Sequence, residues 1–122
     1  MRLAACLVAL SMTVATPAIA QPVMVGGESD YDACGSVGKV VGLNPNGDNY
    51  LSVRAEASSK GRELDRLGPE TNVFMCDQRG RWIGVVYGSG CGVGSPIPQR
   101  KAYNGPCRSG WVFKKYIQLI AG

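Results

Sequence analysis

The chain contains five cysteines and no histidine, and these counts limit the chemistry that is open to it. Cys34, Cys76, Cys91 and Cys107 form an even set, which is typical of disulfides in exported proteins. No two of them are spaced as Cys-x-x-Cys and no imidazole is present, so we expect two disulfides and no metal site. Four cysteines allow three pairings, and the sequence alone does not choose between them. We favour Cys91 with Cys107, which would close a segment rich in glycine and proline, and Cys34 with Cys76.

Groups suited to catalysis are sparse. Without histidine, Ser-His-Asp and Cys-His mechanisms are closed to the unaided chain. Two close carboxylate pairs, Asp30 with Asp32 and Glu63 with Asp65, are better explained as solvated surface charge, although paired-carboxylate or serine–lysine chemistry stays formally open. Residues 88–94 are glycine-rich but lack the Lys-Ser/Thr ending of a phosphate-binding loop. We therefore expect a protein that is not an enzyme and that holds no cofactor.

Residues 1–20 have the pattern of a secretory signal peptide. Arg2 supplies the positive charge, an apolar stretch follows, and residues 18–20 form a small-x-small cleavage site. The mature chain would begin at Gln21, and Cys6 would leave with the signal. A retained anchor is the alternative, but the stretch is shorter than a bilayer requires, and no later segment qualifies as a span. We expect a periplasmic or secreted protein the size of one small domain.

Charge is distributed unevenly along the chain. All nine carboxylates lie between Glu28 and Asp77, together with five basic residues, whereas residues 78–122 carry seven basic residues and no acid. One interpretation is that the C-terminal half meets an anionic partner. We favour the other, in which strands from both halves alternate in the fold and their charges mix on the surface. Nucleic acid is not an expected partner of an exported chain with this modest net charge.

Apolar and polar residues alternate in several short segments, as in half-buried strands. The segment 63–67 is ambiguous, because its two leucines are three residues apart and fit either a strand or a helical turn. Residues 21–36 read as an extended N-terminal arm, and residues 55–62 read as a loop. Residues 88–109 form a long irregular excursion. The other segments expected to be strands are 39–43, 51–54, 71–77 and 81–87.

Four motifs occur in one order along the chain: Tyr50-Leu51-Ser52-Val53-Arg54, Leu67-Gly68-Pro69-Glu70-Thr71-Asn72-Val73, Gly80-Arg81-Trp82-Ile83-Gly84-Val85, and Gly110-Trp111-Val112 running into Lys115-Tyr116-Ile117. This order resembles the bacterial Src homology 3 domain family, small β-barrels that bind peptides or cell-wall polymers. The resemblance implies an all-β fold, with a partly open barrel of five or six strands over residues 37–122. It also implies that 63–67 is a strand and that 115–117 form one tight helical turn. The 88–109 excursion departs from the family, which has a short turn there.

The resemblance also implies a binding site. Residues matching Trp82 and Tyr116 commonly line a shallow groove in this family, and Trp111 matches its Gly-Trp element. Aromatic rings suit such a groove because they stack on proline or sugar faces and still offer a hydrogen bond. The alternative is that both tryptophans cap the barrel or lie under the excursion. The excursion itself carries Tyr103, Arg100 and Lys101, which would form either a second contact surface or simply a soluble loop.

These observations lead to two hypotheses. The first is an exported, non-catalytic binding module that recognises a peptide or peptidoglycan-like ligand through the aromatic groove. The second is an inhibitor or immunity-type protein that binds a partner enzyme through the 88–109 loop. Oligomeric state is open at this point.

Overall fold

The structure is a computed structural model that describes residues 4–12 and 20–122. Residues 13–19 lie outside the described part of the chain, so most of the expected cleavage region does too. Residues 4–12 form no helix or strand. Within the two described ranges, no helix is long and apolar enough to cross a membrane.

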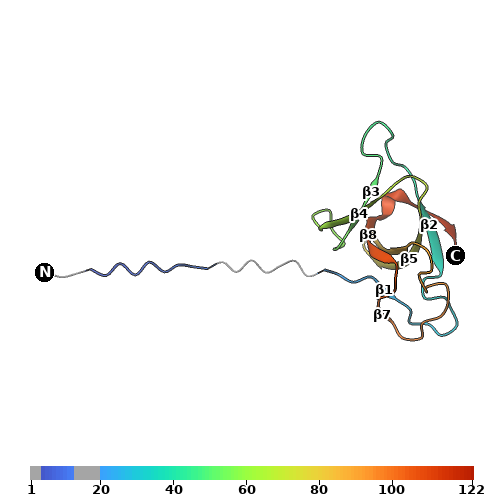
Figure 1. The fold of residues 1–122 in the computed structure, drawn as a ribbon, viewed down its shortest axis with the longest axis horizontal. Helices are drawn as coiled ribbons and strands as arrows, with labels where there is room; N and C mark the ends of the chain where they lie inside the picture. The colour runs from blue at the N-terminus through green and yellow to red at the C-terminus, as the bar shows by residue number, and fades with distance from the viewer. Residues whose placement is uncertain (1–3, 13–19) are drawn as a thin grey trace.

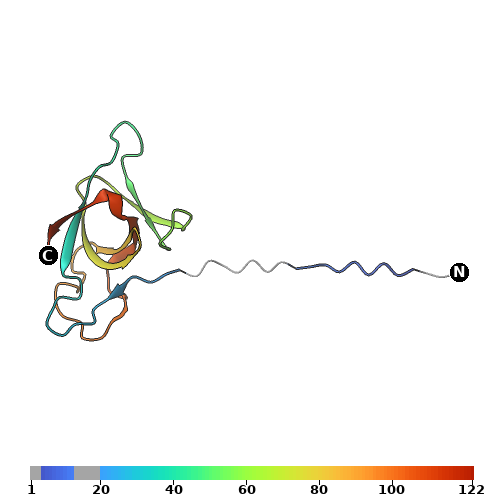
Figure 2. The ribbon, with the colours of Figure 1, turned by 180° about the vertical axis from the view of Figure 1, so that it is seen from behind.

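The fold is all-β, as expected, and every strand pairing is antiparallel. A seven-stranded sheet has the order β4-β3-β8-β6-β5-β2-β9, and β1 pairs with β7 in a second, two-stranded sheet. The large sheet curls into a ring around its core (Figures 1 and 2). The elements are β1 (Met24–Val25), β2 (Ser36–Val40), β3 (Leu51–Arg54), β4 (Glu63–Leu67), β5 (Asn72–Arg79), β6 (Trp82–Tyr87), β7 (Lys101–Ala102), β8 (Arg108–Phe113), η1 (Lys114–Tyr116) and β9 (Ile117–Ala121).

Three sequence expectations need correction. In the described part of the chain, the large sheet has seven strands instead of five or six, and the N-terminal arm and the excursion contribute two further short ones, β1 and β7. The first strand of the large sheet, expected at 39–43, ends at Val40, because Gly42 takes a left-handed φ of 72°. The tight helical turn occupies Lys114–Tyr116, one residue earlier than expected. The ambiguous segment Glu63–Leu67 is a strand.

The inside of the curled sheet is filled by mostly aliphatic side chains from six of its strands. Alternation places every second residue of a strand on this concave side. Residues at the centre of the cluster have no exposed surface, which identifies it as the main core. The buried members are Val40, Leu51, Val53, Leu67, Val73, Ile83, Val85, Tyr87 and Val112.

A second apolar cluster, the outer cluster, lies on the convex side of the same sheet. Val86 and Trp111 belong to the sheet, Val23 and Val25 to the N-terminal arm, and Val93 to the excursion, and each is at most 2% exposed. Strand β6 is apolar on both faces, so each face needs a cover, and the arm and the excursion together provide the outer one. Glycine at position 84 permits their approach, since a Cβ there would lie 2.8 Å from the Asp77 side chain and 3.0 Å from Val23.

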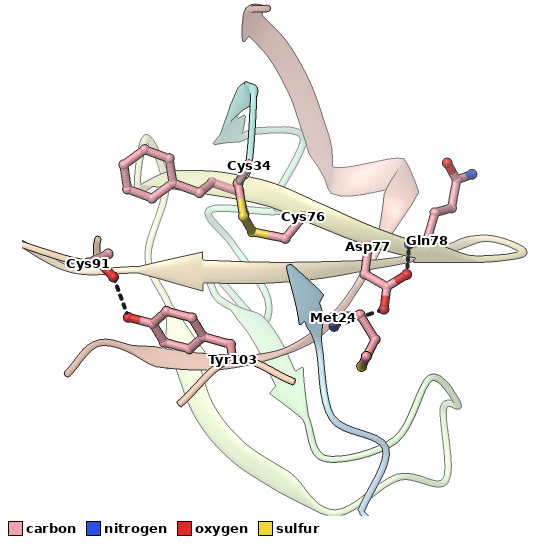
Figure 3. The surroundings of a disulfide bond; sticks show 8 residues. Met24, Cys34, Cys76, Asp77, Gln78, Cys91 and Tyr103 are labelled. Atoms are coloured by element: carbon pink, nitrogen blue, oxygen red, sulfur yellow. Dashed lines mark hydrogen bonds between the residues drawn. A yellow bond between two sulfur atoms is a disulfide. The ribbon is translucent and has the colours of Figure 1, made fainter. Parts of the chain in front are cut away.

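Two disulfides hold this outer cover, and they are the pairs favoured from the sequence. Cys34 in the arm is bonded to Cys76 in β5 (Figure 3), and Cys91 is bonded to Cys107 at the two ends of the excursion. The register of β5 against β6 shifts between Met75 and Asp77, so Cys76 sits in a bulge. The first disulfide therefore attaches the arm to the large sheet, and the second closes the excursion on itself just before β8.

A buried tyrosine and an aspartate are paired at one end of the inner core. The Tyr87 hydroxyl donates a hydrogen bond of 2.9 Å to Asp65, and an Arg108 guanidinium nitrogen lies 3.2 Å from the same oxygen. The backbone N–H of Arg66, with smaller contributions from the Tyr87 hydroxyl and Arg108, lowers the pKa of Asp65 below its ordinary value of 3.8. Burial, followed by the bond to Asp65, raises the pKa of Tyr87 above its ordinary value of 10.0.

These two shifts set the expected pH dependence of stability. Asp65 has a lowered pKa in the folded state, so its contribution is present above about pH 4 and is lost as the pH falls. Tyr87 has a raised pKa, so its contribution is present below about pH 10 and is lost at more alkaline pH. We expect Tyr87→Phe to remove the alkaline loss, as measured by urea midpoints of both proteins across the pH range. Parallel alkaline profiles for the two proteins would contradict this assignment.

Candidate functional site

A surface pocket of about 560 Å³ opens beside strands β3, β6 and β8. Its aromatic wall comes from Trp82 in β6, Phe113 at the end of β8 and Tyr116 in η1. The opposite wall comes from the β2–β3 loop, β3, the β3–β4 loop and the start of β4. We call this pocket the aromatic groove. Its other lining residues are Gly42, Leu43, Asn44, Asp48, Tyr50, Leu51, Ser52, Arg54, Ser59 and Glu63.

The three wall aromatics contact one another in a row. Trp82 and Phe113 are cross-strand partners in the β6–β8 ladder, and their ring centroids are 5.4 Å apart. Phe113 and Tyr116 are 6.3 Å apart, also with tilted rings. All three residues are half-buried, so each ring has one packed side and one exposed side. A row of this kind presents a continuous apolar strip to a ligand.

Polar and charged groups form the other side of the aromatic groove. Glu63 accepts hydrogen bonds from the Ser52 hydroxyl at 2.6 Å and from the Arg66 guanidinium at 2.7 Å. These bonds, the one from Ser52 first, lower the pKa of Glu63, which keeps the carboxylate charged. Arg54 donates to the Gly61 carbonyl at 2.9 Å. Several of the polar side chains in this wall are thus held in place before any ligand arrives.

Trp111 does not line the aromatic groove, which corrects the expectation that both tryptophans do. Trp111 and Phe113 are two residues apart in β8 and therefore lie on the same face of the strand. The N-terminal arm nevertheless covers Trp111, which is 0% exposed. Its indole N–H donates to the backbone carbonyl of Gln21 at 2.8 Å. Gln21 is itself fixed by bonds to the backbone of Ala55 and Ala57. Trp111 is therefore a residue of the outer cluster.

The three expected contact residues of the excursion lie outside the aromatic groove. The Tyr103 hydroxyl donates to the Cys91 carbonyl at 2.8 Å and accepts from the Cys107 N–H at 3.1 Å, which braces the disulfide (Figure 3). Arg100 forms an ion pair of 3.2 Å with Asp77. Lys101 is exposed in β7. Tyr103 and Arg100 thus hold the excursion together and attach it to β5.

Sequence reasoning missed two aromatic residues of the pocket, Phe113 and Tyr50. Phe113 follows Trp111 at the spacing of one strand face, and that alternation is the signal that would have found it. Tyr50 comes directly before the Leu51–Arg54 strand, and the Arg66 guanidinium lies over its ring, 4.2 Å from the centroid. No local pattern predicts that contact, because the β3–β4 pairing creates it.

Among residues 4–12 and 20–122, no group of three or more acidic or cysteine side chains is placed to hold a metal ion. Comparison of the chain with protein-family models, with curated proteins and with solved structures finds no match.

Proposed function

We propose that this protein is an exported, non-catalytic binding module of the Src homology 3 type, which holds a peptide or peptidoglycan-like ligand in the aromatic groove. The observation that carries the proposal is the row of Trp82, Phe113 and Tyr116 along one wall of a single open pocket. Flat rings bind the apolar face of a peptide or sugar without demanding one sequence. The fixed polar groups across the pocket supply hydrogen bonds that orient the ligand.

Two disulfides support the proposed export, because such bonds form and persist in extracellular or periplasmic surroundings. They also fit a small domain whose outer cover consists of segments with little regular structure. A disulfide-braced cover keeps the sheet rigid beside the pocket, and a rigid site loses less conformational entropy on binding.

The inhibitor-type alternative has less support. It needs the 88–109 loop to project toward a partner enzyme, whereas Val93 is fully buried in the outer cluster. Cys34 and Gly27 of the N-terminal arm also donate backbone hydrogen bonds to Val93 and Ile97. The loop is thus attached to the arm and the sheet at Val93 and Ile97, which limits how far this part of it can reach toward a partner.

Replacing Trp82 with alanine should weaken ligand binding by about 30-fold or more, since a large aromatic contact of a binding site contributes about 2 kcal/mol or more. The ligand for the test is a soluble peptidoglycan fragment consisting of a disaccharide with its stem peptide, titrated against the mature protein by calorimetry. Tyr116→Ala should give a smaller loss, because a tyrosine ring offers less contact surface than an indole.

The matched control is Tyr31→Ala, which removes an aromatic side chain that is 69% exposed and does not line the aromatic groove. It should leave affinity unchanged. Circular dichroism confirms that each variant is folded. If folded Trp82→Ala binds the fragment as tightly as the unaltered protein, the aromatic groove is not the binding site.

A further inference from the structure

Four basic residues gather beside the aromatic groove with no acidic residue among them. Arg79 and Arg81 flank Gly80 in the turn between β5 and β6, and Lys114 and Lys115 begin η1 directly after β8. The two segments are neighbours in space, because the backbone N–H of Lys114 donates to the Arg81 carbonyl at 2.8 Å. All four side chains are exposed. We call these residues the cationic cluster.

The four residues of the cationic cluster, like Lys101 in β7, have no ion-pair partner among the described residues, whereas the other two basic residues of the C-terminal half are paired. Arg100 is paired with Asp77 and Arg108 with Asp65, both at 3.2 Å. These pairs follow from strands of the two halves lying side by side, as the sequence interpretation expected. The four charges of the cationic cluster are not neutralised by an acidic residue of the N-terminal half. Their electrostatic field therefore acts on the solvent and on a ligand bound nearby.

Three residues of the cationic cluster are direct sequence neighbours of the three aromatic wall residues. Arg81 precedes Trp82, Lys114 follows Phe113, and Lys115 precedes Tyr116. The Lys115 ammonium lies 5.6 Å from the centroid of the Tyr116 ring, which lines the aromatic groove. None of the four residues lines the pocket itself, and the Arg79 guanidinium lies over the buried Trp111 ring, 5.4 Å from its centroid. A ligand that follows the three rings past Tyr116 would come close to the Lys115 charge first.

We propose that the aromatic groove takes an acidic peptide, whose backbone and apolar parts lie on the row of rings and whose carboxylates face Arg81, Lys114 and Lys115. This inference rests on the proposed function and narrows its ligand class. Carboxylates and guanidinium or ammonium groups form charge-assisted hydrogen bonds, which give the ligand a direction along the groove.

The lining of the aromatic groove itself carries two acidic residues and one basic residue, Asp48, Glu63 and Arg54. Glu63 is engaged by Ser52 and Arg66. The three charged lining residues come from the β2–β3 loop, β3 and β4, whereas the aromatic wall comes from β6, β8 and η1. The carboxylates of a bound peptide would therefore lie past the aromatic wall, toward the cationic cluster.

The test compares two synthetic peptides of alternating glutamate and alanine, one with free carboxylates and one with every carboxylate replaced by its amide. Calorimetry at low and moderate salt should show the acidic peptide binding about tenfold more tightly, with an advantage that shrinks as salt is raised. The double variant Arg81→Gln with Lys114→Gln should lose about fivefold to tenfold for the acidic peptide, and little for the amide.

A control variant with the same change in charge is Lys39→Gln with Lys101→Gln, because Lys39 lies in β2 and Lys101 in β7, and neither adjoins a residue of the aromatic wall in the chain. It should bind the acidic peptide as the unaltered protein does. Equal affinity for the two peptides, or equal loss in both double variants, would overturn the acidic-peptide assignment and leave the aromatic groove standing. Binding of anionic phospholipid vesicles that survives Trp82→Ala, with no binding of either peptide, would overturn the assignment and the proposed function together.

Discussion

Replacing Trp111 with alanine is expected to lower the free energy of unfolding by about 3–5 kcal/mol, the usual cost of deleting a large buried aromatic side chain. Trp111 is the largest fully buried side chain of the protein and the centre of the outer cluster. Its removal leaves a cavity under the N-terminal arm and an unpaired carbonyl at Gln21. Because small domains are stable by only about 5–15 kcal/mol, the effect should be plain in urea or thermal unfolding.

Two further variants separate the causes of this loss. Trp111→Phe keeps most of the packing but removes the indole N–H, so it should destabilise the protein by less than alanine does. Trp82→Ala, at a half-buried position, should destabilise it less than Trp111→Ala while affecting binding more. The assignment of Trp111 to a structural role would be wrong if Trp111→Ala left the unfolding midpoint unchanged and abolished binding.

Removal of the Cys34–Cys76 disulfide should cost about 4 kcal/mol on the loop-entropy model. The bond closes a separation of 42 residues, and it attaches the arm that covers Trp111 to strand β5. The double variant Cys34→Ser with Cys76→Ser is therefore expected to lose both the restriction of the unfolded chain and the attachment of the arm. Chemical denaturation of the variant and the unaltered protein, without reductant, measures the difference.

The second disulfide provides the comparison for this prediction. Cys91–Cys107 spans 16 residues, so its removal should cost about 3 kcal/mol, less than the first. Reductant added to the unaltered protein should lower stability by at least as much as either double variant does. A larger loss from the shorter loop would show that native packing of the excursion, rather than loop entropy, decides the order.

Much of the fold could be predicted because it depends on local patterns. Leu51–Arg54 alternates with period two, which is the pattern of a strand with one buried face, and the structure has a strand there. The segment 81–87 was expected to be a strand, and β6 lies there, with a separate apolar cluster covering each of its faces. Local pattern did not reveal β1 and β7, since two-residue strands exist only through pairing with each other.

The site was predicted in part. Trp82 and Tyr116 line one pocket, but Phe113 joins them and Trp111 does not. The pairing of the charged residues was also predicted in part. Arg100 and Arg108 form ion pairs with acidic residues of the N-terminal half, as expected. Arg81 and Lys114 are joined to each other by a backbone hydrogen bond and form no ion pair among the described residues.

The sequence by itself determined the all-β character and the even set of cysteines, because alternation and composition act over a few residues or over the whole chain. Only the tertiary structure decided which aromatic rings are accessible. Trp111 and Phe113 stand on the same face of one strand, two residues apart, yet a segment 90 positions away in the chain covers the first and leaves the second in the pocket. The burial of a side chain depends on the segment that packs against it. For Trp111 that segment is distant in the sequence, and no local pattern predicts its position.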